Sequence, residues 1–260
     1  MLNPLPAPLP EVSFSDEGHI RHLHLGTPWI QGSINLAKPD ELVHEYIQRM
    51  MAWLLFADAA KVPQMQAMQL GLGAGSLTRF CNRVLKMKTC AVELNPQVLA
   101  ACQGWFKLPA PTARLQVLLA DAAEEIKNPK WWGTVDALQV DLYDHEAAAP
   151  VLDDAAFYAD CRRLLTDNGC MTVNLFGRSS SFAKSVAKIA LAFPSTPAAQ
   201  AIWAFKPTRE GNTVVVAHRT PVARKMAVLA ARAETIQTRW GLNAPQWVRR
   251  LQPVTLSTAL

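Results

Sequence analysis

The chain has 260 residues, half of them hydrophobic, and a formal net charge of +5. This length fits one large α/β domain with a sizeable core. The longest apolar run, near residues 50–57, is too short to span a bilayer, and the first ten residues lack the basic start and apolar core of a secretory signal. We therefore expect a cytoplasmic protein with no membrane partner.

The N-terminal part is expected to precede the main domain. Residues 1–10 alternate proline with small or apolar residues, which favours a short extended arm. Residues 11–38 contain short strand-like runs separated by glycines, which predicts a small β section. His22 and His24 lie on one face of such a strand and raise the question of a metal site. Because no third ligand lies nearby, we interpret them as surface histidines and expect no metal.

Strands and helices alternate in the main domain, which is predicted at residues 39–240. A proline start and a broad apolar stripe predict a first helix over 39–57. Further helices are predicted at 77–86, from 96 onward, and at 153–165, 180–193 and 221–240. Strands are predicted up to the glycine at 71 and at 89–93, 115–120, 135–140, 170–176, 201–205 and 213–218. Residues 241–260 are expected to form a polar tail.

This order predicts the fold class. Alternating strands and helices imply an α/β fold with a mostly parallel, Rossmann-like sheet covered on both faces, with ligands at the carboxyl ends of the strands. Glu210-Gly211-Asn212 predicts a hairpin between the last two strands. A terminal antiparallel strand departs from a dehydrogenase domain. It indicates the fold of class I S-adenosylmethionine-dependent transferases, preceded here by the small β section.

A glycine-rich turn is the strongest local signal. Gly71, Gly73 and Gly75 follow a strand and precede a helix, so backbone N–H groups lie beside a positive helix end, with no side chain to block a ligand. Glu93 ends the next strand, about 20 residues on, where an acid can accept hydrogen bonds from a ribose diol. A structural turn with a chance acid downstream is the alternative. The two features together favour a nucleoside-cofactor pocket.

Further acids follow the ends of later strands. Asp121 can accept from the exocyclic amine of adenine or cap the next helix, and both roles are compatible. Asp141 and Asp144 lie three positions apart after an apolar strand, so both can face the cofactor. Two carboxylates there need a cation, and an amine substrate would supply it. A solvated loop with helix-capping acids is the alternative.

The run from about residue 14 to residue 219 resembles the spermidine synthase (polyamine aminopropyltransferase) family. The matching marks, in the family's order, are Gln31, Asp40-Glu41, His44-Glu45, Leu70–Gly75, Val92-Glu93, Asp121, Asp141-x-x-Asp144 and Phe157-Tyr158. The resemblance implies that Asp141 is the base and Asp144 the anchor of the distal ammonium. It implies that Gln31, His44 and Tyr143 shape the amine pocket.

The chain departs from this family at several positions. Ala74 stands where the family has an aspartate that holds the amine of decarboxylated S-adenosylmethionine. Val43 replaces a tyrosine, although Tyr46 is near, and His145 replaces a proline. A later active-site tyrosine has no clear match around Trp203. The co-substrate therefore stays open between decarboxylated and intact S-adenosylmethionine.

The resemblance implies transfer of an aminopropyl group from decarboxylated S-adenosylmethionine to a polyamine such as putrescine, with no metal. A methyltransferase that uses intact S-adenosylmethionine is one alternative, because Gly73-Ala74-Gly75 resembles its turns. The lack of an Asn/Asp-Pro-Pro-aromatic motif after residues 135–140 speaks against an amino methyltransferase. A non-catalytic nucleoside-binding relative is another. The expected partner is a small-molecule amine, and a homodimer is one assembly to consider.

Two features remain. The five cysteines form no C-x-x-C pair and most lie in apolar runs, which predicts buried thiols in a reducing compartment. Between Arg219 and Arg250 there are seven basic residues and one acid, Glu234. Such a segment can attract nucleic acid, but the solvated side of a helix is the interpretation we favour.

Overall fold

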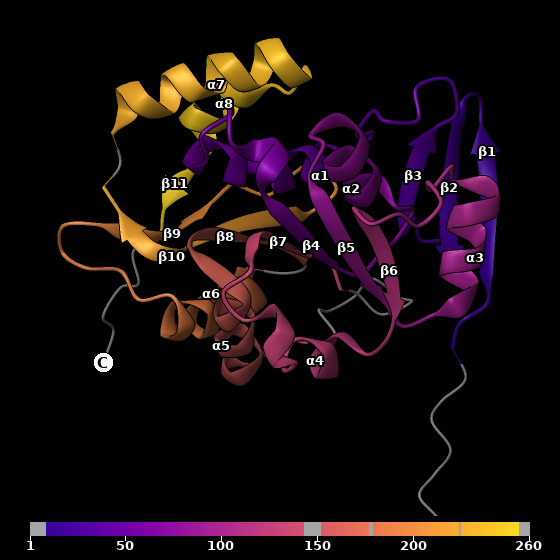
Figure 1. Ribbon diagram of the computed structural model, residues 1–260, viewed down its shortest axis with the longest axis horizontal. Coiled ribbons are helices and arrows are strands. Elements are labelled where there is room, and N and C mark those ends of the chain that lie inside the picture. The colour runs from indigo at the N-terminus through magenta and orange to yellow at the C-terminus, as the bar shows by residue number, and fades with distance from the viewer. Residues whose placement is uncertain (1–8, 143–151, 177–178, 224, 255–260) are drawn as a thin grey trace, which may run out of the picture.

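A mixed β-sheet forms the centre of the molecule (Figure 1). The structure is a computed structural model and describes residues 9–142, 152–176, 179–223 and 225–254. Within them, eight strands form the main sheet in the order β11-β9-β10-β8-β7-β4-β5-β6. Their bounds are β4 Gln66–Leu70, β5 Lys88–Glu93, β6 Leu115–Leu119, β7 Val135–Val140, β8 Leu165–Phe176, β9 Gln200–Ala204, β10 Asn212–Val222 and β11 Gln252–Pro253.

The direction of the strands confirms the predicted fold class. Strands β4 to β8 pair in parallel, whereas β10 pairs antiparallel with β8 and with β9. The inner parallel strands β4, β5 and β7 are almost entirely buried, because helices cover both faces of this part of the sheet. The carboxyl ends of β4, β5, β6 and β7 consequently lie along one edge, where the predicted acids follow them.

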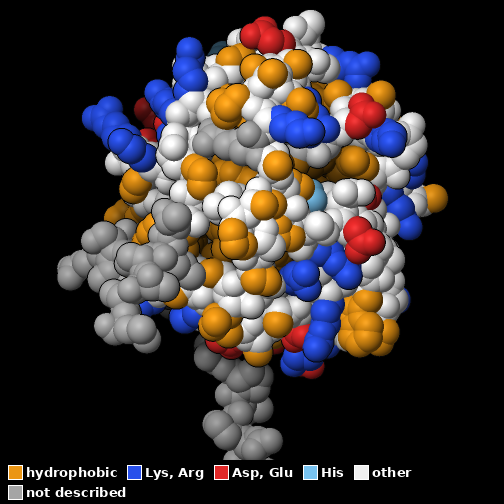
Figure 2. Space-filling view, turned by 90° about the vertical axis from the view of Figure 1, so that its left-hand side faces the viewer, with side chains coloured by type: hydrophobic (Ala, Val, Ile, Leu, Met, Phe, Trp, Pro, Cys, Tyr) orange, Lys and Arg blue, Asp and Glu red, His pale blue; other side chains and the backbone are white. Residues whose placement is uncertain are grey.

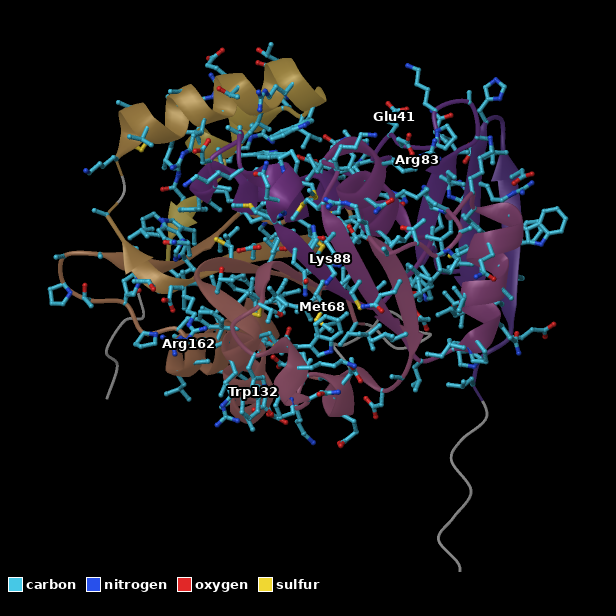
Figure 3. All side chains as sticks on the ribbon, in the orientation of Figure 1. Glu41, Met68, Arg83, Lys88, Trp132 and Arg162 are labelled. Carbon is cyan, nitrogen blue, oxygen red and sulfur yellow. The ribbon has the colours of Figure 1, made fainter. Side chains whose placement is uncertain are left out.

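Helices and short helical turns cover the two faces of the sheet (Figure 1). On one face lie α1 (Glu45–Arg49), α2 (Ser76–Arg79), α7 (Met226–Trp240) and α8 (Ala244–Arg250). On the other lie α4 (Ala122–Glu125), α5 (Ala155–Leu164) and α6 (Ser179–Ala192). Met68 of β4 is fully buried in this second layer (Figure 3). The two layers form separate apolar cores, one on each side of the sheet.

The predicted N-terminal β section is present as a three-stranded antiparallel sheet. Its strands are β1 Val12–Glu17, β2 Ile20–Leu25 and β3 Gly32–Asn35. It lies beside α3 (Pro96–Trp105), where Asn95 Nδ2 donates to the Pro10 carbonyl and the Val12 N–H donates to Gln97 Oε1. These bonds hold the small sheet over the carboxyl end of β5.

The helix predicted over residues 39–57 is wrong in its first part and in its type. The segment up to His44 is not helical, α1 covers five residues, and Met50–Phe56 is a 3-10 helix. Polar groups of the chain use the early carbonyls: Arg79 Nε donates to the Pro39 carbonyl, and Gln48 Nε2 donates to that of Leu42. Residues 50–55 are buried on every side, so the apolar run reflects complete burial rather than one face of a regular helix.

The C-terminal region also differs from the prediction. Strand β10 continues to Val222, so α7 begins at Met226 rather than at residue 221. Residues 241–254 are not simply a polar tail, because α8 packs Trp247 and Val248 into the first core and β11 pairs with β9. The proline of this segment does not end its structure, since it is tolerated in the first turn of a helix.

Three basic residues of the C-terminal region bind other parts of the chain. Arg232 donates to the Leu55 carbonyl, Arg239 to that of Ala59, and Arg250 lies 3.4 Å from Glu45. On the face shown in Figure 2, Lys and Arg side chains are interspersed with hydrophobic and acidic ones rather than joined in one stripe. Among the residues described, no helix is long and apolar enough to cross a membrane.

Candidate active site

A cavity of about 770 Å³ opens at the carboxyl ends of the parallel strands, beneath the N-terminal sheet. Most of the residues predicted for the site line it: Gly71, Gly73, Glu93, Asp121, Asp141, Gln31 and His44. Gly75 is not among the lining residues, and Tyr143 and Asp144 lie outside the described residues. The fold therefore brings together seven of the ten predicted side chains and backbone positions.

The glycine turn is built for close backbone approach. Gly71 has φ +89°, and a Cβ there would collide with the carbonyl oxygen of Asp141. The Asp141 N–H in turn donates to the Leu70 carbonyl at 3.0 Å. The lack of a side chain at Gly71 thus lets the end of β7 lie against the end of β4. Gly75, with φ +69°, instead forms the left-handed start of α2.

A buried arginine supports this turn from below. The guanidinium of Arg79, in the first turn after Gly75, is fully buried and donates to the carbonyls of Ala74 at 2.6 Å and Phe106 at 2.8 Å. Burial lowers the pKa of Arg79 to about 10, so the group stays charged at neutral pH. This role could not be predicted from the sequence, because an arginine in a helix ordinarily faces solvent.

Glu93 holds the turn and faces the cavity. Its Oε2 accepts from the Leu72 N–H at 3.0 Å and its Oε1 from the Asn95 N–H at 2.8 Å. Burial raises the pKa of Glu93, while these backbone donors act in the opposite direction. Each carboxylate oxygen can accept a second bond, so the side chain keeps acceptor capacity for a ribose hydroxyl.

Asp121 carries out the capping role that the sequence left open. Its Oδ1 accepts from the Ala123 N–H at 2.8 Å, at the start of α4. The side chain also lines the cavity. Capping is therefore observed, and contact with an adenine amine stays a prediction.

Asp141 lies at the end of β7, held by two side chains. Asn174 Nδ2 of β8 donates to its Oδ1 at 2.9 Å, and the Tyr46 hydroxyl of α1 donates to its Oδ2 at 3.5 Å. Burial raises the pKa of Asp141 to about 6, although both hydrogen bonds favour the ionised form. A carboxylate with this pKa is ionised at neutral pH and is a stronger base than an exposed aspartate.

A second set of hydrogen bonds leads from the cavity into the N-terminal sheet. His44 Nε2 lies 2.7 Å from Ser33 Oγ, which lies 2.7 Å from His22 Nδ1. The His44 ring stacks on Tyr46, with centroids 5.9 Å apart and an interplanar angle of 24°. The interpretation of His22 as a surface histidine is therefore wrong, since it is mostly buried and bonded to Ser33. His24, in contrast, binds Ser15 at the edge of the same sheet.

The sequence did not predict several residues that line the cavity. Asn174 and Phe176 come from the end of β8, and Glu210 and Asn212 from the turn between β9 and β10. Asn212 Nδ2 donates to Asn174 Oδ1 at 3.2 Å, which ties this turn to the partner of Asp141. The usable signal was topological: β8 neighbours β7 in the sheet, so polar residues near its end belong to the same edge.

Ala74 does not face the open cavity. It is 3% exposed, and a Cβ on Gly32 would come within 2.9 Å of its Cβ and 2.8 Å of its backbone nitrogen. Strand β3 therefore covers the position at which the resemblance leads us to expect an aspartate. Within the described ranges, no group of three or more His, Cys, Asp or Glu side chains could hold a metal ion.

Both sequence relatives and solved structures are similar to this chain. No protein-family model matches it. A polyamine aminopropyltransferase of Neisseria meningitidis serogroup A is 33% identical over 244 residues, covering 93% of this chain and 89% of the relative. One from Chromobacterium violaceum is 32% identical over 253 residues, covering 96% and 93%.

Solved structures agree on the fold. A probable spermidine synthase from Corynebacterium glutamicum superposes with a TM-score of 0.68 at 18% identity, over 96% of this chain and 95% of that one. Human methyltransferase-like protein 13, in complex with SAH, gives 0.63 at 19% identity, over 84% and 98%. Since the sequence relatives share a third of their residues over nearly the whole length, the chain belongs to the polyamine aminopropyltransferase family and is a transferase.

Proposed function

We propose that this chain transfers an aminopropyl group from decarboxylated S-adenosylmethionine to a small amine such as putrescine. The observation that carries the proposal is Asp141, an ionised carboxylate with a pKa of about 6 beside the glycine turn. A member of this family needs a base at that place, because its amine substrate arrives protonated at neutral pH.

The nucleoside would lie along the glycine turn. Glu93 retains acceptor capacity for the ribose hydroxyls. One oxygen of Asp121 caps α4, which leaves the other for the exocyclic amine of adenine. Leu94 and Val98 add apolar surface to the same wall of the cavity. The polar and apolar groups of this part of the cavity therefore suit an adenosyl group.

The chemical step would use Asp141 as general base. The carboxylate takes a proton from the substrate ammonium, and the nitrogen lone pair then attacks the methylene carbon bonded to the sulfonium. The carbon–sulfur bond breaks and its electron pair stays on sulfur, which leaves a neutral thioether, while the product nitrogen carries the positive charge. The proton held by Asp141 returns to solvent. Asn174 and Tyr46 fix the carboxylate for this transfer.

The distal ammonium of a diamine needs a second acid. Asp144 remains a proposal for this role, because it lies outside the described residues. Glu210 is a further candidate that the structure supplies: it lines the cavity and has no ion pair among the described residues. Glu45 also lines the cavity, but Arg49 at 2.6 Å and Arg250 at 3.4 Å neutralise it. Among the described residues we therefore propose Glu210 for the attraction of the second ammonium, beside the proposal for Asp144.

Two aromatic side chains line the cavity, one beside each of the two acids Asp141 and Glu210. A Cβ on Gly211 would lie 3.1 Å from the Phe176 ring, so the turn that carries Glu210 packs directly over this ring. Phe176 lines the cavity together with Tyr46. These aromatic side chains suit the methylene chain of a diamine, and cations also bind well to aromatic faces.

The test is to incubate the protein with an amine and either decarboxylated or intact S-adenosylmethionine, and to weigh the products. Gain of one aminopropyl group supports the proposal, and gain of one methyl group supports the methyltransferase alternative. The similarity to methyltransferase-like protein 13 concerns the fold alone, so it does not favour that alternative. If no product forms with either co-substrate or with any amine tested, while nucleoside binding is intact, the protein would be a non-catalytic relative.

Two further expectations belong here. All five cysteines are free and buried, which fits a reducing compartment such as the cytoplasm. A homodimer is proposed as the assembly and is tested by light scattering.

A further inference from the structure

The hydrogen-bonded chain from His44 to the N-terminal sheet has no part in the reaction proposed above. It runs from His44 through Ser33 to His22, with both heavy-atom distances at 2.7 Å. Beyond it, His22 Nε2 lies 3.8 Å from the carboxylate of Glu17, which is exposed. These contacts thus link a cavity-lining imidazole to the outer edge of β1.

The protons that these hydrogen bonds share can be counted. A serine hydroxyl has one proton, so Ser33 donates to one imidazole and accepts from the other. A carboxylate only accepts, so when His22 is neutral Glu17, 3.8 Å from its Nε2, favours the tautomer that carries the proton on Nε2. His22 Nδ1 is then an acceptor for the Ser33 hydroxyl. Ser33 must accept from His44 Nε2–H, and His44 Nδ1 carries no proton.

The other nitrogen of His44 is available to the cavity. Among the described residues His44 Nδ1 has no hydrogen-bond partner, and stacking on Tyr46 fixes the ring plane. Burial and repulsion from His22 lower the pKa of His44, while attraction to Glu210 opposes them. The neutral ring, which has two tautomers, is therefore the form present at neutral pH.

We propose that Ser33 and His22, with a smaller contribution from Glu17, fix the tautomer of His44 so that its bare Nδ1 accepts a hydrogen bond from the ammonium group of the acceptor amine. His22 and Ser33 are positioning residues in this scheme. The identity of the amine rests on the proposed function, whereas the tautomer does not.

The direct test measures the tautomer. In nitrogen-15-labelled protein, long-range proton–nitrogen spectra distinguish a protonated ring nitrogen from a bare one, and His44→Gln identifies the signals of His44. We expect a bare Nδ1 and a protonated Nε2 in the wild-type protein, and a mixed or inverted pattern in Ser33→Ala. A protonated Nδ1 in the folded wild-type protein would overturn the inference, whatever the activity.

The functional test uses a matched pair on the same sheet. Ser15 Oγ and His24 Nε2 lie 2.8 Å apart, and neither residue lines the cavity, so they copy the Ser33–His22 pair without its link to His44. Ser33→Ala and His22→Phe should raise the Michaelis constant of the amine about 3- to 10-fold with turnover nearly unchanged, as expected for one hydrogen bond. Ser15→Ala should leave both constants unchanged, and His24 is not substituted because its Nδ1 lies 3.1 Å from the carbonyl oxygen of Trp29, which lines the cavity.

The outcomes separate the hypotheses. Equal effects in Ser33→Ala and Ser15→Ala, or effects that follow a fall in melting temperature, would assign the change to the stability of the N-terminal sheet and contradict the inference. Failure of the wild-type protein to transfer any aminopropyl group would instead refute the proposed function. The nitrogen spectra would still decide the tautomer in that case.

Discussion

Asn174 donates a hydrogen bond of 2.9 Å from its Nδ2 to Oδ1 of Asp141, across 33 positions of the chain. The two residues stand on the neighbouring parallel strands β8 and, just beyond its end, β7. This bond favours the ionised carboxylate, whereas burial disfavours it, and burial has the larger effect. The pKa of Asp141 is therefore set by two opposing influences that can be changed separately.

Asp141→Asn should abolish most of the activity while making the protein more stable at neutral pH. Loss of the general base should lower turnover by about 10²-fold or more, with affinity for the nucleoside unchanged. The raised pKa of Asp141 means that stability falls as pH rises from the unfolded-state pKa to about 6. The amide lacks this cost, so the gain in melting temperature over wild type should be larger at pH 7.5 than at pH 4.5.

The control for this substitution lies on the same strand. Asp136, in β7, accepts from the Gln66 N–H at 2.8 Å and from the Thr166 hydroxyl at 2.9 Å, away from the cavity. Asp136→Asn should lower the melting temperature, with residual activity in proportion to the folded fraction. Near-wild-type turnover in Asp141→Asn would show that this carboxylate is not the base.

The pH dependence of kcat/KM should show an acidic limb near pH 6, because the base must be ionised in the free enzyme. In Asn174→Ala the carboxylate loses a hydrogen bond that lowers its pKa, so the limb should move to higher pH, by about 0.5 to 1 unit for a bond of ordinary strength. pH–rate profiles of the two proteins measure this shift. A limb that stays in place, or moves to lower pH, would contradict the assignment of Asp141 as the titrating group.

Glu93→Gln should weaken the binding of methylthioadenosine by more than about tenfold, because a charged hydrogen bond to the ribose contributes about 1.5–3 kcal/mol. Gly73→Val should do the same by filling the turn, since a Cβ there would lie 3.2 Å from the Gln31 carbonyl oxygen. Calorimetric titration of folded protein measures both. The exposed Glu124→Gln is the control, and unchanged affinity in both test variants would refute the assignment of the nucleoside pocket.

Ala74→Asp should destabilise the protein rather than create an ammonium site. Its side chain is packed against Gly32, so an aspartate would be buried without a partner, at a cost of about 2 kcal/mol or more. Denaturant unfolding measures this cost, and Ala74→Ser should give an intermediate value. A stable Ala74→Asp protein with a new preference for decarboxylated S-adenosylmethionine would show that β3 moves away from this position.

Glu210→Gln should raise the Michaelis constant for a diamine about tenfold or more while leaving that for a monoamine such as butylamine unchanged, because the monoamine has no second ammonium to attract. The exposed Glu234→Gln on α7 is the matched control for loss of one negative charge. Steady-state kinetics with both amines provide the comparison. Equal changes for monoamine and diamine would indicate a structural effect of the turn instead.

The sequence by itself determined the fold class and much of the site. Runs of apolar residues that end in Gly71, Glu93, Asp121 or Asp141 marked parallel strands whose carboxyl ends share one edge, and the structure places all four at the cavity. This inference succeeds because burial on both faces of a parallel strand leaves a local pattern in the sequence. Complete burial also misled it, since the apolar residues 50–55 imitate a longer regular helix.

Only the tertiary structure decided which side chains meet. Tyr46 reaches Asp141 across 95 positions, and His44 reaches Ser33 across 11, through the docking of separate elements. The guanidinium of Arg79 donates to the Ala74 carbonyl of the glycine turn instead of facing solvent. Gly32 packs against Ala74, so Ala74 does not face the cavity. Such partners depend on strand order, register and the position of the small sheet. Local periodicity reports whether a residue is buried, and carries no information about what it is buried against.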